Sequence, residues 1–100
     1  MAGHMAGYKL FPFQTRSIVG QTSAVDLNTL TQGGIYLFFN GGFEHLNKPS
    51  GSMDGVIVVF SYTQNNVQYM IQLYCDYVSN LFYRIKWGEN WKSWCKVTYS

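Results

Sequence analysis

Three tryptophans, Trp87, Trp91 and Trp94, lie within eight consecutive residues near the end of the chain. Tryptophan joins a large apolar ring to one polar N–H, so it either fills a core or presents a flat face to a sugar ring. Trp87 ends a segment on the phase predicted to be buried, and we expect it in the core. Trp91 and Trp94 flank a predicted turn, where they either cap the open end of a small sheet or contact a ligand.

The remaining residues with reactive side chains do not form a recognisable catalytic or metal-binding pattern. His45 stands beside Glu44 in a long Gly-rich segment, and we expect it to be a surface residue. The five acidic residues are scattered, without the pair that glycoside hydrolysis requires. The Gly-rich stretches lack the strand and helix that frame a phosphate-binding loop. We therefore expect no catalytic, cofactor-binding or metal-binding residues.

The cysteines, Cys75 and Cys95, are predicted to lie at opposite ends of one sheet face. Roughly 20 Å of strand would separate them, whereas a disulfide needs Cα atoms within about 7 Å. We expect two free, buried thiols, which suits assembly in a reducing cytoplasm.

The composition is that of one small domain with a polar but weakly charged surface. The chain has 100 residues, of which 18% are aromatic and only 12% charged. A formal charge of +2 without a Lys/Arg run does not indicate nucleic acid binding. No apolar stretch approaches the roughly 20 residues that a membrane helix needs. We expect neither a nucleic acid partner nor membrane insertion.

The chain divides into three parts. Residues 1–7 look like a cloning scar or tag remnant, residues 8–25 like an extended lead-in segment, and residues 26–100 like the folded domain. Asp26 is a good N-cap for one helical turn, which Gly33 and Gly34 would end. The strand patterns cover 35–39, 56–62, 67–75, 81–87 and 94–100, and residues 40–55 form a long loop that is either functional or tied down.

Alternating side chains predict the fold class and the register. The period of two indicates a mainly β protein, a small antiparallel β-meander or sandwich with one short helical turn. Symmetric turns would place Leu73, Ile71 and Tyr69 opposite Tyr83, Ile85 and Trp87, and these opposite Tyr99, Val97 and Cys95, all inside. The outer face would carry Gln72, Tyr74 and Arg84. Its apolar part, around Ile57, Val59 and Met70, needs a cover from the lead-in segment or another subunit.

The order of short motifs resembles the pyocin-knob type of phage tail-fibre domain. The matching pieces are Asp26–Leu30, Gly34–Tyr36, Pro49–Gly51, Gly55, Tyr83 with Arg84, and the closing Trp91, Ser93 and Trp94. The departures are the two residues between Gly88 and Trp91, and the tail from Cys95. The resemblance spans residues 26–97 and implies a β-rich knob of a tail fibre or R-type bacteriocin fibre. Such fibres are homotrimers that recognise bacterial surface receptors, often saccharides.

Two functions follow from this resemblance. The first is a non-enzymatic receptor-binding, host-recognition module of a virion tail fibre, assembled in the bacterial cytoplasm and attached to surface polysaccharide. The second is a structural knob that spaces or trimerises the fibre and binds no ligand; a small hydrolase is disfavoured because no acid–base pair is present. Aromatic faces and amides suit neutral sugars. The predicted ligand-binding residues, in the turns and on the outer face, are Gln64, Asn65, Asn66, Gln72, Tyr74, Tyr77, Asn80, Arg84 and Trp91.

Overall fold

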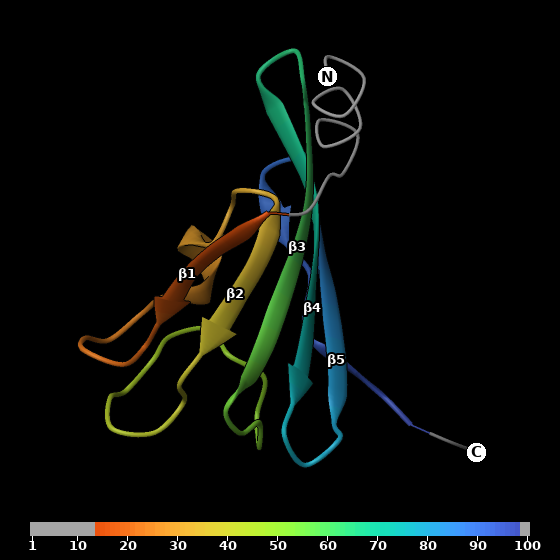
Figure 1. Cartoon of the computed structure of the whole chain (residues 1–100). Coiled ribbons are helices and arrows are strands. Elements are labelled where there is room, and N and C mark those ends of the chain that lie inside the picture. The colour runs from red at the N-terminus through yellow and green to blue at the C-terminus, as the bar shows by residue number, and fades with distance from the viewer. Residues whose placement is uncertain (1–13, 99–100) are drawn as a thin grey trace, which may run out of the picture.

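A computed structural model describes residues 14–98, which form one twisted sheet with a single 3-10 turn (Figure 1). The predicted tag remnant, residues 8–13 of the lead-in and Tyr99 lie outside the described residues. The elements in chain order are β1 (Thr15–Val19), η1 (Leu27–Thr29), β2 (Gly34–Phe38), β3 (Gly55–Gln64), β4 (Val67–Asp76), β5 (Leu81–Trp87), β6 (Asn90–Trp91) and β7 (Cys95–Val97).

The strands follow one another across the sheet in the order β1-β2-β3-β4-β5-β6, and β7 also pairs with β5. Only the β1–β2 pairing is parallel; the others are antiparallel. The predicted mainly β meander with one helical turn is confirmed, and β1 lies within the predicted extended lead-in. The long β3–β4 hairpin projects beyond the rest of the sheet (Figure 1).

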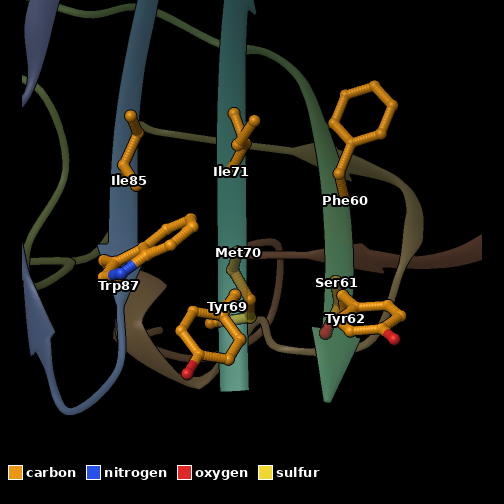
Figure 2. A pocket seen from close by; sticks show the side chains of 8 residues that line it. All are labelled: Phe60, Ser61, Tyr62, Tyr69, Met70, Ile71, Ile85 and Trp87. Carbon is orange, nitrogen blue, oxygen red and sulfur yellow. The ribbon is translucent and has the colours of Figure 1, made fainter. Parts of the chain in front are cut away.

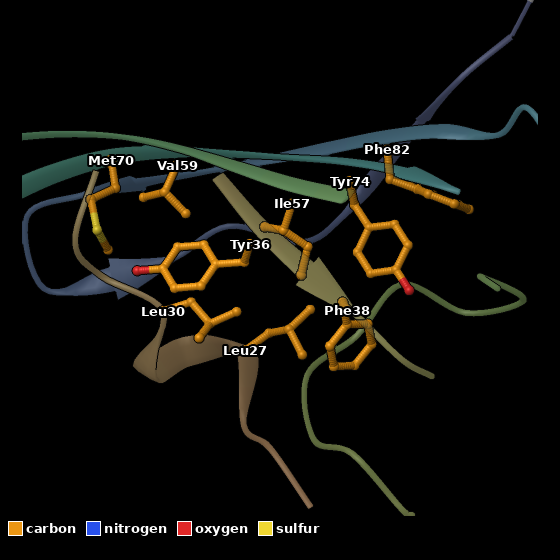
Figure 3. Close-up of a cluster of buried hydrophobic side chains, with 9 residues drawn as sticks. All are labelled: Leu27, Leu30, Tyr36, Phe38, Ile57, Val59, Met70, Tyr74 and Phe82. Carbon is orange, nitrogen blue, oxygen red and sulfur yellow. The ribbon is translucent and has the colours of Figure 1, made fainter. Parts of the chain in front are cut away.

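The core lies on one side of the sheet, between the strands and η1 with the loops (Figure 3). Asp26 caps η1 as predicted, because its carboxylate accepts a hydrogen bond from the Asn28 N–H at 2.9 Å. The turn presents Leu27 and Leu30 to side chains that rise from the sheet. The remaining buried apolar residues are Tyr36, Phe38, Ile57, Val59, Met70, Tyr74 and Phe82.

The predicted long loop over residues 40–55 is tied down over this core. The Leu27 N–H donates to the Leu46 carbonyl, and the Leu46 N–H donates to the Val25 carbonyl, at 3.0 and 2.8 Å. The Asn40 side chain donates to the Ser52 carbonyl. Pro49 is fully buried. The loop therefore serves as the second layer of this small domain.

The predicted register between β4 and β5 is confirmed, but the predicted inside and outside are reversed. Leu73, Ile71 and Tyr69 do pair with Tyr83, Ile85 and Trp87. These residues face away from the core, which is instead contacted by the alternate set of side chains. Trp87, expected in the core, is 72% exposed. The alternation of apolar and polar residues did not predict which side of the sheet is buried, because η1 covers the side that carries Gln72 and Arg84.

The predicted pairing of the last strand is wrong by four residues. Cys95 lies opposite Tyr83 rather than Trp87, and Val97 lies opposite Leu81 rather than Ile85. The short strand β6 intervenes, so the turn after β5 is not symmetric. Both cysteines are free as expected but exposed rather than buried. The reversal of faces is the reason, since both belong to the set predicted to be inside.

Candidate functional site

The nine predicted ligand-binding residues fall into three separate places. Gln64, Asn65 and Asn66 form the β3–β4 turn at one end of β4, and Tyr77 and Asn80 belong to the β4–β5 turn at the other end. The remaining four lie on the core side of the sheet: Gln72, Tyr74, Arg84 and Trp91. The two turns do not form a common site.

The backbone conformation of the β3–β4 turn explains why it contains two asparagines. Asn65 and Asn66 have φ values of 54° and 64°. Positive φ at both central residues is the requirement of a type I′ hairpin turn, and asparagine tolerates it. Both side chains are exposed, so the turn can present amides, but its sequence is explained by its geometry.

The β4–β5 turn is organised by a buried carboxylate. Asp76 is 7% exposed, and its oxygens accept hydrogen bonds from the N–H groups of Val78 and Asn80 and from the Asn80 side chain. Its Oδ2 also accepts from the Met53 N–H at 3.1 Å. Asn80 therefore holds the turn together, while Tyr77, at 73% exposure, is available to a ligand.

Replacing Asp76 with asparagine is expected to weaken the fold at neutral pH and flatten its acid denaturation. Burial alone would raise the pKa of Asp76, but hydrogen bonds from Asn80, Met53 and Val78 outweigh it and lower that pKa below 3.8. The stabilisation is thus present above pH 3.8 and disappears as pH falls through the lower folded-state pKa. Urea denaturation between pH 7 and pH 2.5 measures it. The control is Glu89→Gln at an exposed position, and equal pH profiles for the two variants would contradict this assignment.

Gln72, Tyr74 and Arg84 were predicted on the outer face, and this placement is wrong. Gln72 and Tyr74 are fully buried, and Arg84 is 4% exposed. The Gln72 amide N–H₂ donates to the carbonyls of Leu27 and Leu30 at 2.8 and 3.0 Å, and its oxygen accepts from Arg84 Nε at 2.9 Å. Gln72 therefore joins the sheet to η1, and buried polar groups are tolerated because they are paired.

Tyr74 is a core residue that spans from the sheet to the loop. Its hydroxyl donates to the Met53 carbonyl, and its ring meets Phe38 and Phe82 edge to face (Figure 3). Burial raises the pKa of Tyr74 to about 12. The negative charges of Asp76 and Asp54 also raise this pKa, and a hydrogen bond with Ser52 lowers it. The phenol thus stays protonated at neutral pH and has no surface from which to bind a ligand.

Arg84 carries a buried positive charge between the sheet and the closing tryptophans. Its guanidinium carbon lies 3.9 Å from the Trp91 ring centroid and 4.7 Å from that of Trp94. Burial lowers the pKa of Arg84 to about 10, opposed by the field of Asp26, so the group stays charged at pH 7. The nitrogen Nη2 is buried and has no hydrogen-bond partner. Trp91 and Trp94 therefore stack on Arg84 and help to hold the fold together, while both also line the hollow described next.

The outer edge of this stack lines a hollow of about 370 Å³, here called the Trp pocket. Trp94 donates its indole N–H to the Asn47 carbonyl at 2.8 Å, which fixes one wall. Sequence reasoning named Arg84, Trp91 and, as one of two alternatives, Trp94, but it missed the other lining residues, which come from three separate segments. The full lining is Asn28, Asn47, Lys48, Arg84, Trp91, Lys92, Ser93 and Trp94.

A second hollow of about 630 Å³ lies between the long loop and the β4–β5 turn, with Tyr77 and Phe43 on its rim. His45 lines it but is buried at 6% exposure, so its expected surface position is wrong. Its Nδ1 accepts a hydrogen bond from the Val25 N–H at 3.0 Å, and Phe38 packs edge-on against its ring. His45 is held in place by the long loop and its neighbours.

The far side of the sheet is apolar and is here called the open face. None of its residues is charged, and large side chains such as Phe60, Ile71 and Trp87 are 39–72% exposed. Figure 2 shows the part that contains Trp87 and Tyr69. Their ring centroids lie 4.8 Å apart, and both residues line a groove of about 300 Å³. The open face comprises Ile35, Leu37, Val56, Val58, Phe60, Tyr62, Tyr69, Ile71, Leu73, Cys75, Leu81, Tyr83, Ile85, Trp87, Cys95 and Val97.

Among residues 14–98, no three His, Cys, Asp or Glu side chains gather in a group that could hold a metal ion. The one helical element over the same range is a single 3-10 turn, and nothing there has the length and hydropathy of a membrane-spanning helix. Comparison with protein-family models, with curated proteins and with solved structures finds no match to this chain.

Proposed function

We propose that this chain is the receptor-binding domain of a phage or phage-like tail fibre, which attaches without catalysis to glycan on a bacterial surface as a homotrimer. The observation that carries the proposal is that the two sides of the sheet have different surfaces. The open face is uncharged and apolar, whereas the Trp pocket and the Tyr77 hollow lie with the loops. One side suits assembly, and the loops suit ligand contact.

The extent of the open face supports assembly between copies. Its nine most exposed large residues are 37–72% accessible. Aromatic side chains offer roughly 150–250 Å² each and the aliphatic ones somewhat less. These fractions leave on the order of 800 Å² of apolar surface, about as much as one partner contributes to a typical stable interface. A patch this large on a protein with so few charges is typical of an interaction site. In this proposal, further copies of the chain bind to the open face.

The positions of the motif residues support the tail-fibre assignment. Leu27 and Pro49 are fully buried, and Arg84 stacks on Trp91 and Trp94. The residues that resemble the pyocin-knob motif thus hold this fold together, as expected for residues shared across knobs with different receptors. Receptor contacts then belong to side chains beside them in the loops.

The structural knob that binds nothing is the second candidate, and the open face favours it as well. Assembly alone accounts for an uncharged apolar sheet face. It does not account for a pocket in which aromatic rings, amides and cations come together. A ligand-binding function uses both features, and we therefore place it first.

Cell attachment tests the proposal directly. The 100-residue chain, displayed on a trimeric scaffold to supply avidity, is incubated with a panel of bacterial strains before and after removal of surface polysaccharide. We expect attachment to at least one strain and its loss on stripping. A folded trimer that attaches equally to stripped and intact cells contradicts glycan recognition, and one that attaches to no strain in the panel favours the structural knob.

A further inference from the structure

The Trp pocket gathers positive charge without any carboxylate in its lining. Three of the seven Lys and Arg residues of the chain meet there: Lys48, Arg84 and Lys92. Lys92 is exposed and Lys48 half-buried, so both ammonium groups can move toward a bound group. The field of Asp26 opposes the charge of Arg84, and Asp26 Oδ1 already accepts hydrogen bonds from the Asn28 N–H and the Asn47 side chain.

The charge of Arg84 is incompletely satisfied by the protein. Its Nε donates to a neutral amide oxygen, and its Nη2 is buried without a partner. Aromatic faces compensate a cation only in part, and the field of a charge is stronger where water is excluded. No carboxylate among residues 14–98 forms an ion pair with Arg84. An anion entering the pocket would meet a positive field already in place.

The rest of the pocket lining suits a sugar ring. Trp91 and Trp94 contribute aromatic surface, and Asn28 has a buried side-chain oxygen without a hydrogen-bond donor. Asn47 and Ser93 add an amide and a hydroxyl, which both donate and accept. A volume of about 370 Å³ lies at the small end of the range for ligand pockets, roughly 300–1,000 Å³. One saccharide unit is the size of ligand that fits.

We propose that the Trp pocket binds an acidic sugar unit. Lys48, Lys92 and the field of Arg84 hold the anionic substituent of the sugar, and the sugar ring lies beside Trp91. The inference rests on the proposed glycan-binding function and names the class of glycan. The pocket lies on the core side of the sheet, opposite the open face. Copies assembled through the open face would therefore leave this site accessible.

Nuclear magnetic resonance of the ¹⁵N-labelled chain tests the ligand class. The three indole N–H signals are followed during titration with methyl glucuronoside, methyl glucoside, glucose 6-phosphate and inorganic phosphate. We expect methyl glucuronoside to shift the signals of Trp91 and Trp94 but not that of Trp87 on the open face. We expect methyl glucoside to bind at least about tenfold more weakly, since a hydrogen bond to a charged group contributes about 1.5 kcal/mol or more.

The other ligands separate the alternatives. Binding of glucose 6-phosphate together with the glucuronoside keeps the acidic-sugar class and widens it to phosphate. Equal shifts with methyl glucoside overturn the requirement for an anion. Shifts with inorganic phosphate as large as those with either acidic sugar overturn the role of the sugar ring. Perturbation of Trp87 alone overturns the location.

The double variant Lys48→Gln/Lys92→Gln tests the residues. It removes two charges whose side chains form no hydrogen bond or ion pair within residues 14–98, and it keeps the backbone bond from the Lys92 N–H to the Ile85 carbonyl. We expect its affinity for methyl glucuronoside to fall at least about tenfold. Lys96→Gln, outside the pocket, is the matched control and should bind as the unmodified chain does. An unchanged affinity in the double variant overturns this site. Failure of cell attachment with glucuronoside binding intact would instead count against the proposed function, so the two failures are distinguishable.

Discussion

The Gln72→Met variant is expected to lose about 3 kcal/mol or more of unfolding free energy, because three buried polar groups lose their partner at once. Methionine has a similar length but no amide, so the carbonyls of Leu27 and Leu30 and the Nε of Arg84 would all lose their partner. Each buried polar group left unpaired costs about 1–3 kcal/mol. Total stabilities of domains are about 5–15 kcal/mol, so a loss of this size would remove a large part of the stability of the fold.

Gln68→Met is the matched control for this prediction. Gln68 lies four residues earlier on the same strand and also donates to a carbonyl, that of Thr31 at 3.1 Å, but it is only half-buried. Water can replace that partner, so we expect a loss below about 1 kcal/mol. Urea denaturation at pH 7 compares the two. A Gln72→Met loss no larger than that of the control would show that the amide does not hold η1 to the sheet.

Local sequence signals predicted the elements of this fold because each signal acts over a few residues. Asp26 caps its turn through its own neighbour Asn28, and the Asn65–Asn66 pair sets the β3–β4 hairpin through its own φ angles. The β4–β5 register followed from the assumption that the turn over residues 76–80 is symmetric. The turn after β5 contains β6, which the sequence did not indicate, so the last register was wrong.

The side of the sheet that faces the core could not be predicted in this way. The more apolar set of alternating residues, around Ile71 and Leu73, was assumed to be inside, yet the set with Gln72 and Arg84 is buried. That set is buried because distant groups satisfy it: carbonyls of η1 for Gln72, and tryptophan rings for Arg84. Such partners are separated by up to 45 residues, and alternation within a strand carries no information about them.

The candidate site was predicted only in part for the same reason. Arg84 and Trp91 were predicted as ligand residues, and they do meet in the Trp pocket. Asn28, Asn47 and Lys48 were missed because they reach the pocket from η1 and the long loop. Tyr77 was predicted from its turn and is exposed, but its hollow is a different one. Reasoning from neighbouring positions in the chain identified single ligand candidates. It could not identify the whole pocket, because the fold brings its lining residues together from distant segments.

The Ile71→Lys variant is expected to abolish self-association, the second large effect. Ile71 lies at the middle of the open face, between Phe60 on β3 and Ile85 on β5. It is 40% exposed, so in a single copy the lysine ammonium can reach water and the fold should change little. Between copies the same charge would be buried without a partner, at a cost of several kcal/mol per ion. In a trimer this cost would be incurred three times.

Sedimentation equilibrium of the 100-residue chain over a range of concentrations measures this effect. We expect the unmodified chain to approach the mass of a trimer and Ile71→Lys to remain monomeric at every concentration. Gln21→Lys adds the same charge at an exposed loop position away from the open face and should assemble normally. Since an uncharged apolar face on the order of 800 Å² is as large as one side of a typical interface, assembly of Ile71→Lys as readily as the control would place the contact between copies elsewhere. If the unmodified chain is monomeric at every concentration, the open face is not an assembly surface of this chain. The open face would then bind a different partner.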